Sequence, residues 1–298
     1  MRSALVSVTP NSWCQNMSET PRLKIVLVDG SNLFWRAAMG FPARIIGRRS
    51  EDITPTFGFF ALLRAGLRSI DAQKVVLVFF DSERSSNQNR KIDYTYKNNR
   101  FGDLSHFDQF DHLIDGLNMC GIRNYVCDDY EADDAIASAR EGHRSHSVTI
   151  FSSDKDFYQL VDEKTEILDT QKKKDAWIIN ANWIVARYGV LPSQWVDYRS
   201  LIGDPADNIK GITGIGPKKA QLLLGKHVTL DNIASMDSDP GPLEGKVLDA
   251  WDDLERARAL LRLDPTLKLE QSPQLEPTAD LPIAAKICEG LSLLREKK

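Results

Sequence analysis

Five carboxylates lie within the seven residues from position 128 to position 134, with no lysine or arginine among them. Glu131 and Asp134 are three residues apart and share one helix face, and Asp133 lies to the neighbouring side of the same turn. One interpretation is that the helix dipole favours acids in the first turn of a helix. The other is that a multivalent cation binds among them, and acids brought to the same place by other strands would favour it.

Four short apolar runs each end in acidic residues. The runs span residues 23–28, 74–80, 122–127 and 148–151, and helical patterns such as 56–70 and 107–119 separate them. Runs of this length followed by turn residues are typical of buried parallel strands. Alternating strands and helices predict an α/β fold with a doubly wound, mostly parallel sheet.

Ligands of such sheets bind in the crevice beyond the carboxyl ends of the strands. The acids that follow the four runs are therefore expected to converge there: Asp29, Asp81, Glu131, Asp133, Asp134, Asp154 and Asp156. Seven converging carboxylates repel one another strongly unless they are protonated or bind metal. This convergence favours the metal interpretation over the helix-start interpretation.

The chemistry of these ligands indicates which metal is expected. All are carboxylates and none of the five histidines lies among them, which favours Mg²⁺ or Mn²⁺ over zinc. Their number exceeds the one or two carboxylates that a single Mg²⁺ usually takes. Two ions about 4 Å apart are therefore expected, as in metal-assisted phosphodiester hydrolysis. No GxxxxGK[ST] loop is present, which argues against an NTPase.

Residues 82–104 form a polar, asparagine-rich and basic stretch that predicts a long functional loop. Lys97 and Arg100 lie between two sets of acids, where they are placed to polarise a scissile phosphate. Tyr96 or Tyr94 is suited to stacking on an unpaired base. The alternative, a solvated basic loop, stays open for this stretch.

Two more acids three residues apart, Asp204 and Asp207, precede a glycine-rich turn between two helical patterns. The turn reads Gly214, Ile215, Gly216, Pro217, Lys218 and Lys219. Glycines let the backbone approach a phosphate, and helix-start amides with lysines can hold a DNA backbone. A purely structural turn is the alternative, which a neighbouring metal site disfavours.

The remaining patterns predict further elements. Short strands are expected at 165–169 and 177–179, and helices at 181–188, 195–201, 243–263 and near 284–294. The predicted helix 243–263 is long and highly charged. These elements suggest a helical region after residue 190 and a proline-rich return after residue 263.

Taken alone, the net charge of −4 and the pI near 5.8 argue against a nucleic-acid partner. Nine carboxylates, the seven converging acids together with Asp204 and Asp207, are assigned to metal and carry −9. Because the whole chain carries −4, the rest of it carries +5, which is compatible with a basic DNA-facing surface. The four cysteines form no CxxC pair, so a reducing compartment is expected. Neither a signal peptide nor an apolar run of membrane-spanning length is seen, and we expect a cytoplasmic protein, in the host cytoplasm if it is phage-encoded.

In order and at matching spacing, several motifs resemble the 5′-nuclease (flap endonuclease) superfamily, which includes phage 5′-exonucleases and the amino-terminal nuclease domain of bacterial family A DNA polymerases. The resemblance covers about residues 22–270. It rests on Val28-Asp29-Gly30, Phe80-Asp81, residues 96–100 (YKNNR), residues 130–134 (YEADD), residues 153–160 (SDKDFYQL), residues 197–208 and Gly214-Ile215-Gly216.

The resemblance implies a PIN-like catalytic core with a helical arch and a helix-three-turn-helix subdomain. It implies a first metal group of Asp29, Asp81, Glu131, Asp133 and Asp134, and a second of Asp154, Asp156, Asp204 and Asp207. Lys97 and Arg100 would act at the base of the arch, with Asp29 and Asp81 at the catalytic centre. Residues 211–220 would grip duplex DNA, often with K⁺ on their backbone carbonyls.

The resemblance divides the chain into a flexible extension (1–21), the catalytic core with its arch at 82–104 (22–189), the DNA-binding region (190–263) and a C-terminal return (264–298). One departure concerns Arg90, which would contact DNA. Asn89 precedes it where the family usually has an aromatic residue. The chain also lacks a polymerase domain, so a stand-alone phage or bacterial enzyme is expected.

The expected activity is a two-metal, structure-specific 5′-3′ exonuclease and 5′-flap endonuclease that serves replication and repair. Its expected partners are DNA with 5′ flaps, gaps or free 5′ ends and RNA–DNA primer junctions, without a membrane and as a monomer. One rival is a non-catalytic DNA-junction-binding protein, which the presence of all nine acids disfavours. The other is a small PIN-type ribonuclease, which the glycine turn disfavours.

Overall fold

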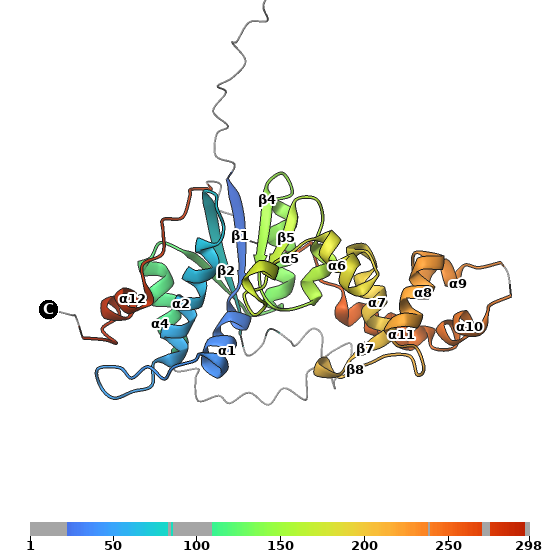
Figure 1. Ribbon diagram of the computed structural model, residues 1–298, viewed down its shortest axis with the longest axis horizontal. Coiled ribbons are helices and arrows are strands. Elements are labelled where there is room, and N and C mark those ends of the chain that lie inside the picture. The colour runs from blue at the N-terminus through green and yellow to red at the C-terminus, as the bar shows by residue number, and fades with distance from the viewer. Residues whose placement is uncertain (1–22, 83–84, 86–108, 238, 270–274, 296–298) are drawn as a thin grey trace, which may run out of the picture.

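The computed structural model describes residues 23–82, 85, 109–237, 239–269 and 275–295 (Figure 1). Its main sheet has the strand order β3-β2-β1-β4-β5-β6. The strands are β1 (Lys24–Asp29), β2 (Lys74–Asp81), β3 (Arg123–Cys127), β4 (Ser147–Phe151), β5 (Thr165–Leu168) and β6 (Ile178–Ile179). The first five are parallel and β6 pairs antiparallel to β5, which confirms the predicted fold class.

Helices cover both faces of this sheet. The helices α1 (Gly30–Gly40), α2 (Thr54–Arg68), α4 (Phe110–Met119) and α12 (Ala284–Gly290) pack on one face, and α5 (Ala132–Gly142) packs on the other. A hydrophobic core lies on each face of the sheet. Successive β1 side chains point to opposite faces, so Val26 packs in one core and Leu27 in the other. The chain runs from β1 outward to β3 and then returns to β4 on the other side of β1. The crevice at this switch point is where such folds bind ligands.

A helical region extends beyond the β5–β6 end of the sheet (Figure 1). It contains α6 (Ala181–Tyr188), α7 (Trp195–Ile202), α8 (Pro217–His227), α9 (Leu230–Ala234), α10 (Pro242–Asp249) and α11 (Trp251–Leu261). A two-stranded hairpin, β7 (Gly203–Asp204) and β8 (Ile209–Lys210), follows α7. Gly203 has φ +78°, and a Cβ there would lie 2.4 Å from the Gly211 nitrogen, so this crossing requires glycine.

The single helix predicted for 243–263 was wrong, because the chain forms α10 and α11 with a break at Ala250. Val247 of α10 and Leu254 of α11 both pack in the main core, and α11 in addition packs Leu260 beside Ile209 of the hairpin. Acids in the first turn of α11 also favour a new helix start there. The last helix ends at Gly290 instead of near residue 294.

The C-terminal return lies beside the amino-terminal end of β2. Thr278 donates its backbone N–H to the Lys74 carbonyl at 2.7 Å and accepts the Val76 N–H on its hydroxyl at 2.9 Å. The predicted extension 1–21 and nearly all of the predicted arch lie outside the described residues. Within the described residues, no helix is both long enough and apolar enough to cross a bilayer.

Val228 has a backbone conformation that β-branched residues rarely adopt, with φ +69° and ψ −49° after the last turn of α8. Its side chain is 54% exposed, so strain relief outweighs the loss of packing. We expect Val228→Gly to raise the free energy of unfolding by about 1 kcal/mol. Urea denaturation measures this change. Val185→Gly in α6, an exposed helical control, should destabilise by about 1 kcal/mol, and equal losses in both variants would contradict the assignment of strain.

Candidate metal centre and nucleic-acid interface

Five of the predicted acids line one pocket of about 340 Å³ at the carboxyl edge of the sheet. They are Asp29, Asp81, Glu131, Asp133 and Asp154, and we call them the first acid group. They follow β1, β2, β3 and β4, so the parallel strands deliver them to one place. Phe34, Trp35, Phe80 and Phe110 line the pocket as well and give it an aromatic side.

Hydrogen bonds across the strand ends hold Asp29 and Asp81. The Asp29 carboxylate caps α1 by accepting the Asn32 N–H at 2.9 Å, and it accepts the Ser152 hydroxyl at 2.8 Å. Asp81 accepts the Ala132 N–H at 2.8 Å, which fixes the start of α5. The Asp81 N–H donates to the Ser31 hydroxyl at 2.8 Å. These bonds join β1, β2, α5 and the residues after β4 around the pocket.

Burial raises the pKa of Asp29 to about 7, and the neighbouring charges of Asp81 and Asp154 add to this shift. Ionising such a buried carboxyl group requires positive charge close to it. Bound divalent ions would supply that charge, and an all-oxygen donor set suits Mg²⁺ or Mn²⁺. The residues of the pocket therefore fit the metal that the sequence predicted.

This shift makes the effect of Mg²⁺ on stability depend on pH. Because Asp29 has a pKa near 3.8 when unfolded and about 7 when folded, its proton stabilises the fold fully below pH 3.8 and progressively less as pH rises through 7. Added Mg²⁺ should therefore raise the Tm more at pH 7.5 than at pH 5.5, where it must displace the proton. Thermal unfolding with Mg²⁺ or EDTA measures this difference. Asp29→Asn should abolish it, and equal gains at both pH values in the wild type would contradict it.

A second acid group lies beside the helical region. Carboxylate oxygens of Asp156, Asp204 and Asp207 all lie within 4.8 Å of one another. Asp156 begins the 3₁₀ helix η2 (Asp156–Leu160). Asp204 precedes and Asp207 ends η5 (Pro205–Asp207) in the β7–β8 hairpin. Arg199 pairs with Asp204, and its Nε lies 3.7 Å from Asp156 Oδ1. An arginine is therefore part of this group.

The structure groups the nine acids differently from the resemblance in two places. Asp154 lines the pocket of the first acid group, and its Oδ1 accepts the Asp156 N–H at 2.9 Å, so it lies between the two groups. Asp134 is not among the described residues that line the pocket. Its Oδ1 accepts the Asp264 N–H at 2.8 Å. Metal binding by individual acids therefore stays a prediction.

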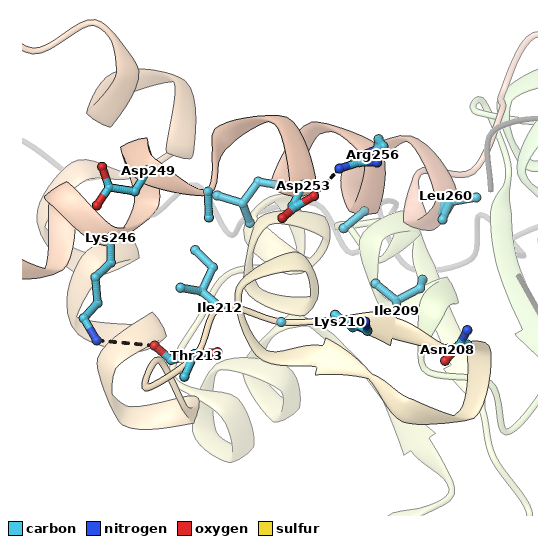
Figure 2. A pocket seen from close by; sticks show the side chains of 14 residues that line it. Asn208, Ile209, Lys210, Ile212, Thr213, Lys246, Asp249, Asp253, Arg256 and Leu260 are labelled. Carbon is cyan, nitrogen blue, oxygen red and sulfur yellow. Dashed lines mark hydrogen bonds and ion pairs between the residues drawn. The ribbon is translucent and has the colours of Figure 1, made fainter. Parts of the chain in front are cut away.

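The glycine turn precedes a helix, α8, as predicted, but the element before it is the β7–β8 hairpin and not a second helix. Gly214 has φ +82°, and Pro217 lies in the first turn of α8. Lys218 and Lys219 are exposed, whereas the Ile215 side chain is 4% exposed and packs in the core. Ile215 can therefore offer DNA its backbone only. Lys219 Nζ donates to the Gly214 carbonyl at 2.7 Å, and Lys246 Nζ donates to the Thr213 carbonyl at 3.3 Å (Figure 2).

Four predicted site residues lie outside the described part of the chain: Arg90, Tyr96, Lys97 and Arg100. Conversely, the sequence assigned no site role to Arg199, Ser152 or Trp35, and it indicated Ser31 only as a possible helix cap. Ser152 follows β4 directly and Ser31 lies two residues after β1, and these positions near strand ends are the signal that would have identified them. Arg199 stands five residues before Asp204, a spacing that carries no such signal.

The sheet order, the acidic carboxyl edge and the attached helical region define a class, the resolvase-like α/β nucleases with a C-terminal helical domain. Residues 24–189 match the family model described as the 5′-3′ exonuclease N-terminal resolvase-like domain, and residues 190–280 match the 5′-3′ exonuclease C-terminal SAM fold. The chain belongs to the 5′-3′ exonuclease family.

Individual relatives agree with this membership. The chain is 31% identical over 266 residues to a DNA polymerase I of Thermus thermophilus, covering 86% of this chain and 31% of that protein. It thus spans about a third of the length of such relatives. It is 30% identical over 213 residues to a 5′-3′ exonuclease of Buchnera aphidicola, covering 70% of this chain and 72% of that one.

Solved structures share the fold at lower identity. T5 5′-exonuclease with bound zinc ions has a TM-score of 0.61 at 19% identity, covering 81% of this chain and 90% of that one. The catalytic core of Rad2 in complex with DNA substrate has a TM-score of 0.55 at 15% identity, covering 92% of each chain.

Proposed function

We propose that the chain is a metal-dependent, structure-specific 5′-3′ exonuclease and 5′-flap endonuclease, which hydrolyses phosphodiesters and leaves a 5′-phosphate. The observation that carries this proposal is the gathering of five acids around one pocket, with a further acid triad beginning two residues after Asp154. Relatives of the family named as 5′-3′ exonuclease and DNA polymerase I support the same activity.

Two Mg²⁺ ions, for which Mn²⁺ would substitute, would supply an activated water and stabilise the leaving oxygen. The first acid group would hold them, with Asp29 and Asp81, which end the neighbouring strands β1 and β2, nearest the reaction. Asp156, Asp204 and Asp207 would extend the site toward the helical region, where Arg199 maintains their spacing. Lys97 and Arg100 would contact the scissile phosphate from the loop after β2.

The substrates that fit this site are DNA with 5′ flaps, gaps or free 5′ ends and RNA–DNA primer junctions, bound by a monomer during replication and repair. The aromatic side of the pocket, which includes Trp35, suits a nucleobase that has left the stack. Tyr96 and Arg90 would contact the same unpaired strand. The glycine turn with Lys218 and Lys219 would hold the duplex backbone through its amides and ammonium groups.

The backbone carbonyls before α8 are the groups that would bind the K⁺ ion that the resemblance implies. Because Thr213 and Gly214 carbonyls already accept from Lys246 and Lys219, K⁺ would compete with two ammonium groups. We expect duplex affinity of the wild type to change by less than about twofold between KCl and LiCl. Lys246→Met should bind about tenfold more weakly in LiCl, a loss comparable to one charged hydrogen bond, and recover part of that affinity in KCl.

Fluorescence anisotropy in Ca²⁺ measures these affinities at equal ionic strength. Lys226→Met is the control, because Lys226 pairs with Glu244 and not with the turn. A strong K⁺ requirement in the wild type would contradict the competition.

The test of the proposed function is cleavage of labelled substrates in Mg²⁺ and in EDTA. The panel comprises a 5′-flap duplex, a 3′-flap duplex, a gapped duplex and a duplex with a 5′ RNA segment. The proposal predicts Mg²⁺-dependent cutting near the 5′-flap junction and little cutting of the 3′ flap. Equal cutting of both flaps, or no cutting in either Mg²⁺ or Mn²⁺, would contradict it.

The rival candidate is a non-catalytic DNA-junction-binding protein, and one observation favours it. Arg199 compensates the charge of Asp156 and Asp204, so these acids need no metal to be stable together. That protein would bind the 5′-flap duplex tightly and cut it in no divalent ion.

A further inference from the structure

The end of α11 and the residues after it are hydrogen-bonded to neighbours of both acid groups. We call residues 261–267 the α11 junction. Its first residue, Leu261, bonds to Gln159 of the 3₁₀ helix that Asp156 begins, and Asp264 bonds to Asp134, the residue after Asp133 in α5. None of the predicted site residues lies in this segment, and its residue types indicate no role.

Gln159 connects the junction to the second acid group. Its side-chain Nε2 donates to the Asp156 carbonyl at 2.8 Å and to the Leu261 carbonyl at 2.9 Å. Its Oε1 accepts the Leu263 N–H at 3.1 Å. One amide group therefore ties the main chain of Asp156 to the end of a helix more than 100 residues away.

The other end of the junction holds α5. The Asp264 N–H donates to the Asp134 carboxylate at 2.8 Å, and the Ser138 hydroxyl donates to the Asp264 carbonyl at 2.8 Å. The Ser138 hydroxyl also accepts the Leu267 N–H at 3.0 Å. Since Asp133 follows Glu131 in the first turn of α5, these bonds restrain the turn that carries them both.

The body of α11 packs on the hairpin that carries Asp204 and Asp207. Ile209 of β8 lies in one apolar cluster with Ala257, Leu260 and Leu261. Beside this contact, a pocket of about 780 Å³ lies between α11, the end of α10 and residues 208–213 (Figure 2). Lys210, Lys246 and Arg256 line it together with Asp249 and Asp253, so the charges around it are mixed.

We propose that the α11 junction aligns the two acid groups for metal binding and that Gln159 is the positioning residue on which this alignment depends. The inference rests on the proposed metal-dependent nuclease. Replacing a side chain that hydrogen-bonds to a metal-binding residue, without binding the metal itself, typically weakens metal binding by about 10- to 100-fold. Without the Gln159 amide, the Asp156 turn loses the side-chain hydrogen bonds that tie it to the end of α11.

Gln194 offers a matched control. Its Nε2 donates to the Leu224 carbonyl at 3.0 Å and to the Val228 carbonyl at 2.9 Å, and its Oε1 accepts the Leu191 N–H at 2.9 Å. It thus makes the same three kinds of bond as Gln159, but between helices that carry none of the nine acids. Gln159→Met and Gln194→Met remove equivalent sets of bonds and retain side-chain length.

The experiment measures Mn²⁺ binding to the full chain by calorimetry without DNA, together with thermal unfolding and binding of a 5′-flap duplex in Ca²⁺. Gln159→Met should weaken Mn²⁺ binding by about 10- to 100-fold, whereas Gln194→Met should leave it within about twofold while lowering the Tm by a similar amount. Ser138→Ala, a smaller change at the other end of the junction, should weaken Mn²⁺ binding by a few fold and is the test if Gln159→Met does not fold.

Equal Mn²⁺ affinities in the wild type, Gln159→Met and Ser138→Ala would overturn the inference, as would equal losses in Gln159→Met and Gln194→Met. In both cases a wild type that binds Mn²⁺ and cuts the 5′ flap would leave the proposed function intact. A wild type that neither binds Mn²⁺ nor cuts DNA would instead overturn the proposed function, and the inference with it.

Discussion

Asp81→Asn is expected to lower the rate of 5′-flap cleavage at saturating DNA by about a thousandfold or more. Asparagine keeps the oxygen that accepts the Ala132 N–H, so the start of α5 should remain in place. What the variant loses is the negative charge at the end of β2. Losing several kcal/mol of metal-dependent stabilisation of the transition state corresponds to a rate change of this size.

Single-turnover cleavage in Mg²⁺ measures the loss, and thermal unfolding checks the fold. Asp129→Asn is the matched control, because Asp129 belongs to the same acidic stretch but is exposed and does not line the pocket. Its cleavage rate should stay within about twofold of the wild type. If Asp81→Asn lowers the cleavage rate by less than tenfold, the result would contradict a catalytic role for Asp81.

Arg258→Met is expected to cost about 3–5 kcal/mol of stability, because it leaves the Asp197 carboxylate buried without its partner. Arg258 is 7% exposed, and its Nε lies 3.1 Å from Asp197 Oδ1. It also pairs with Asp231 of α9 and Glu255 of α11. Burial raises the pKa of Asp197 even beside this arginine, which indicates how much the site depends on the pair.

Urea denaturation measures the cost. Arg256→Met is the control, since Arg256 pairs with Asp253 at the exposed surface and should cost no more than about 1 kcal/mol. Adding Asp197→Asn to Arg258→Met should restore part of the lost stability. Equal effects of the two arginine variants would contradict a structural role for the buried pair.

The convergence of the acids was predictable because it depends on topology alone. Parallel strands end at one edge, so residues such as Asp29 and Asp81, each the last of its strand, meet there whatever the side chains around them are. Their separation in the sequence is large, but the alternation of strands and helices fixes their neighbourhood. The fold class and the first acid group therefore followed from pattern.

Other features depend on contacts that no pattern encodes. The break at Ala250 is one of them, because the sequence pattern from 243 to 263 is helical throughout and does not indicate that α11 packs against Ile209 of the hairpin. Gln159 reaches Leu261 across the fold, and its place in the motif at residues 153–160 does not indicate that contact. Asp134 accepts from a backbone N–H of the C-terminal return, which only the packed structure brings near.

The measurement that tests the central claim most directly is 5′-flap cleavage by the Asp154→Asn/Asp156→Asn double variant, which removes one charge from each acid group. Cleavage in Mg²⁺ is compared with binding of the same duplex in Ca²⁺. The metal-dependent nuclease predicts that the wild type cuts near the junction, that EDTA abolishes cutting, and that the variant still binds but no longer cuts. A wild type that binds tightly and cuts in neither Mg²⁺ nor Mn²⁺ would contradict it and favour the junction-binding protein.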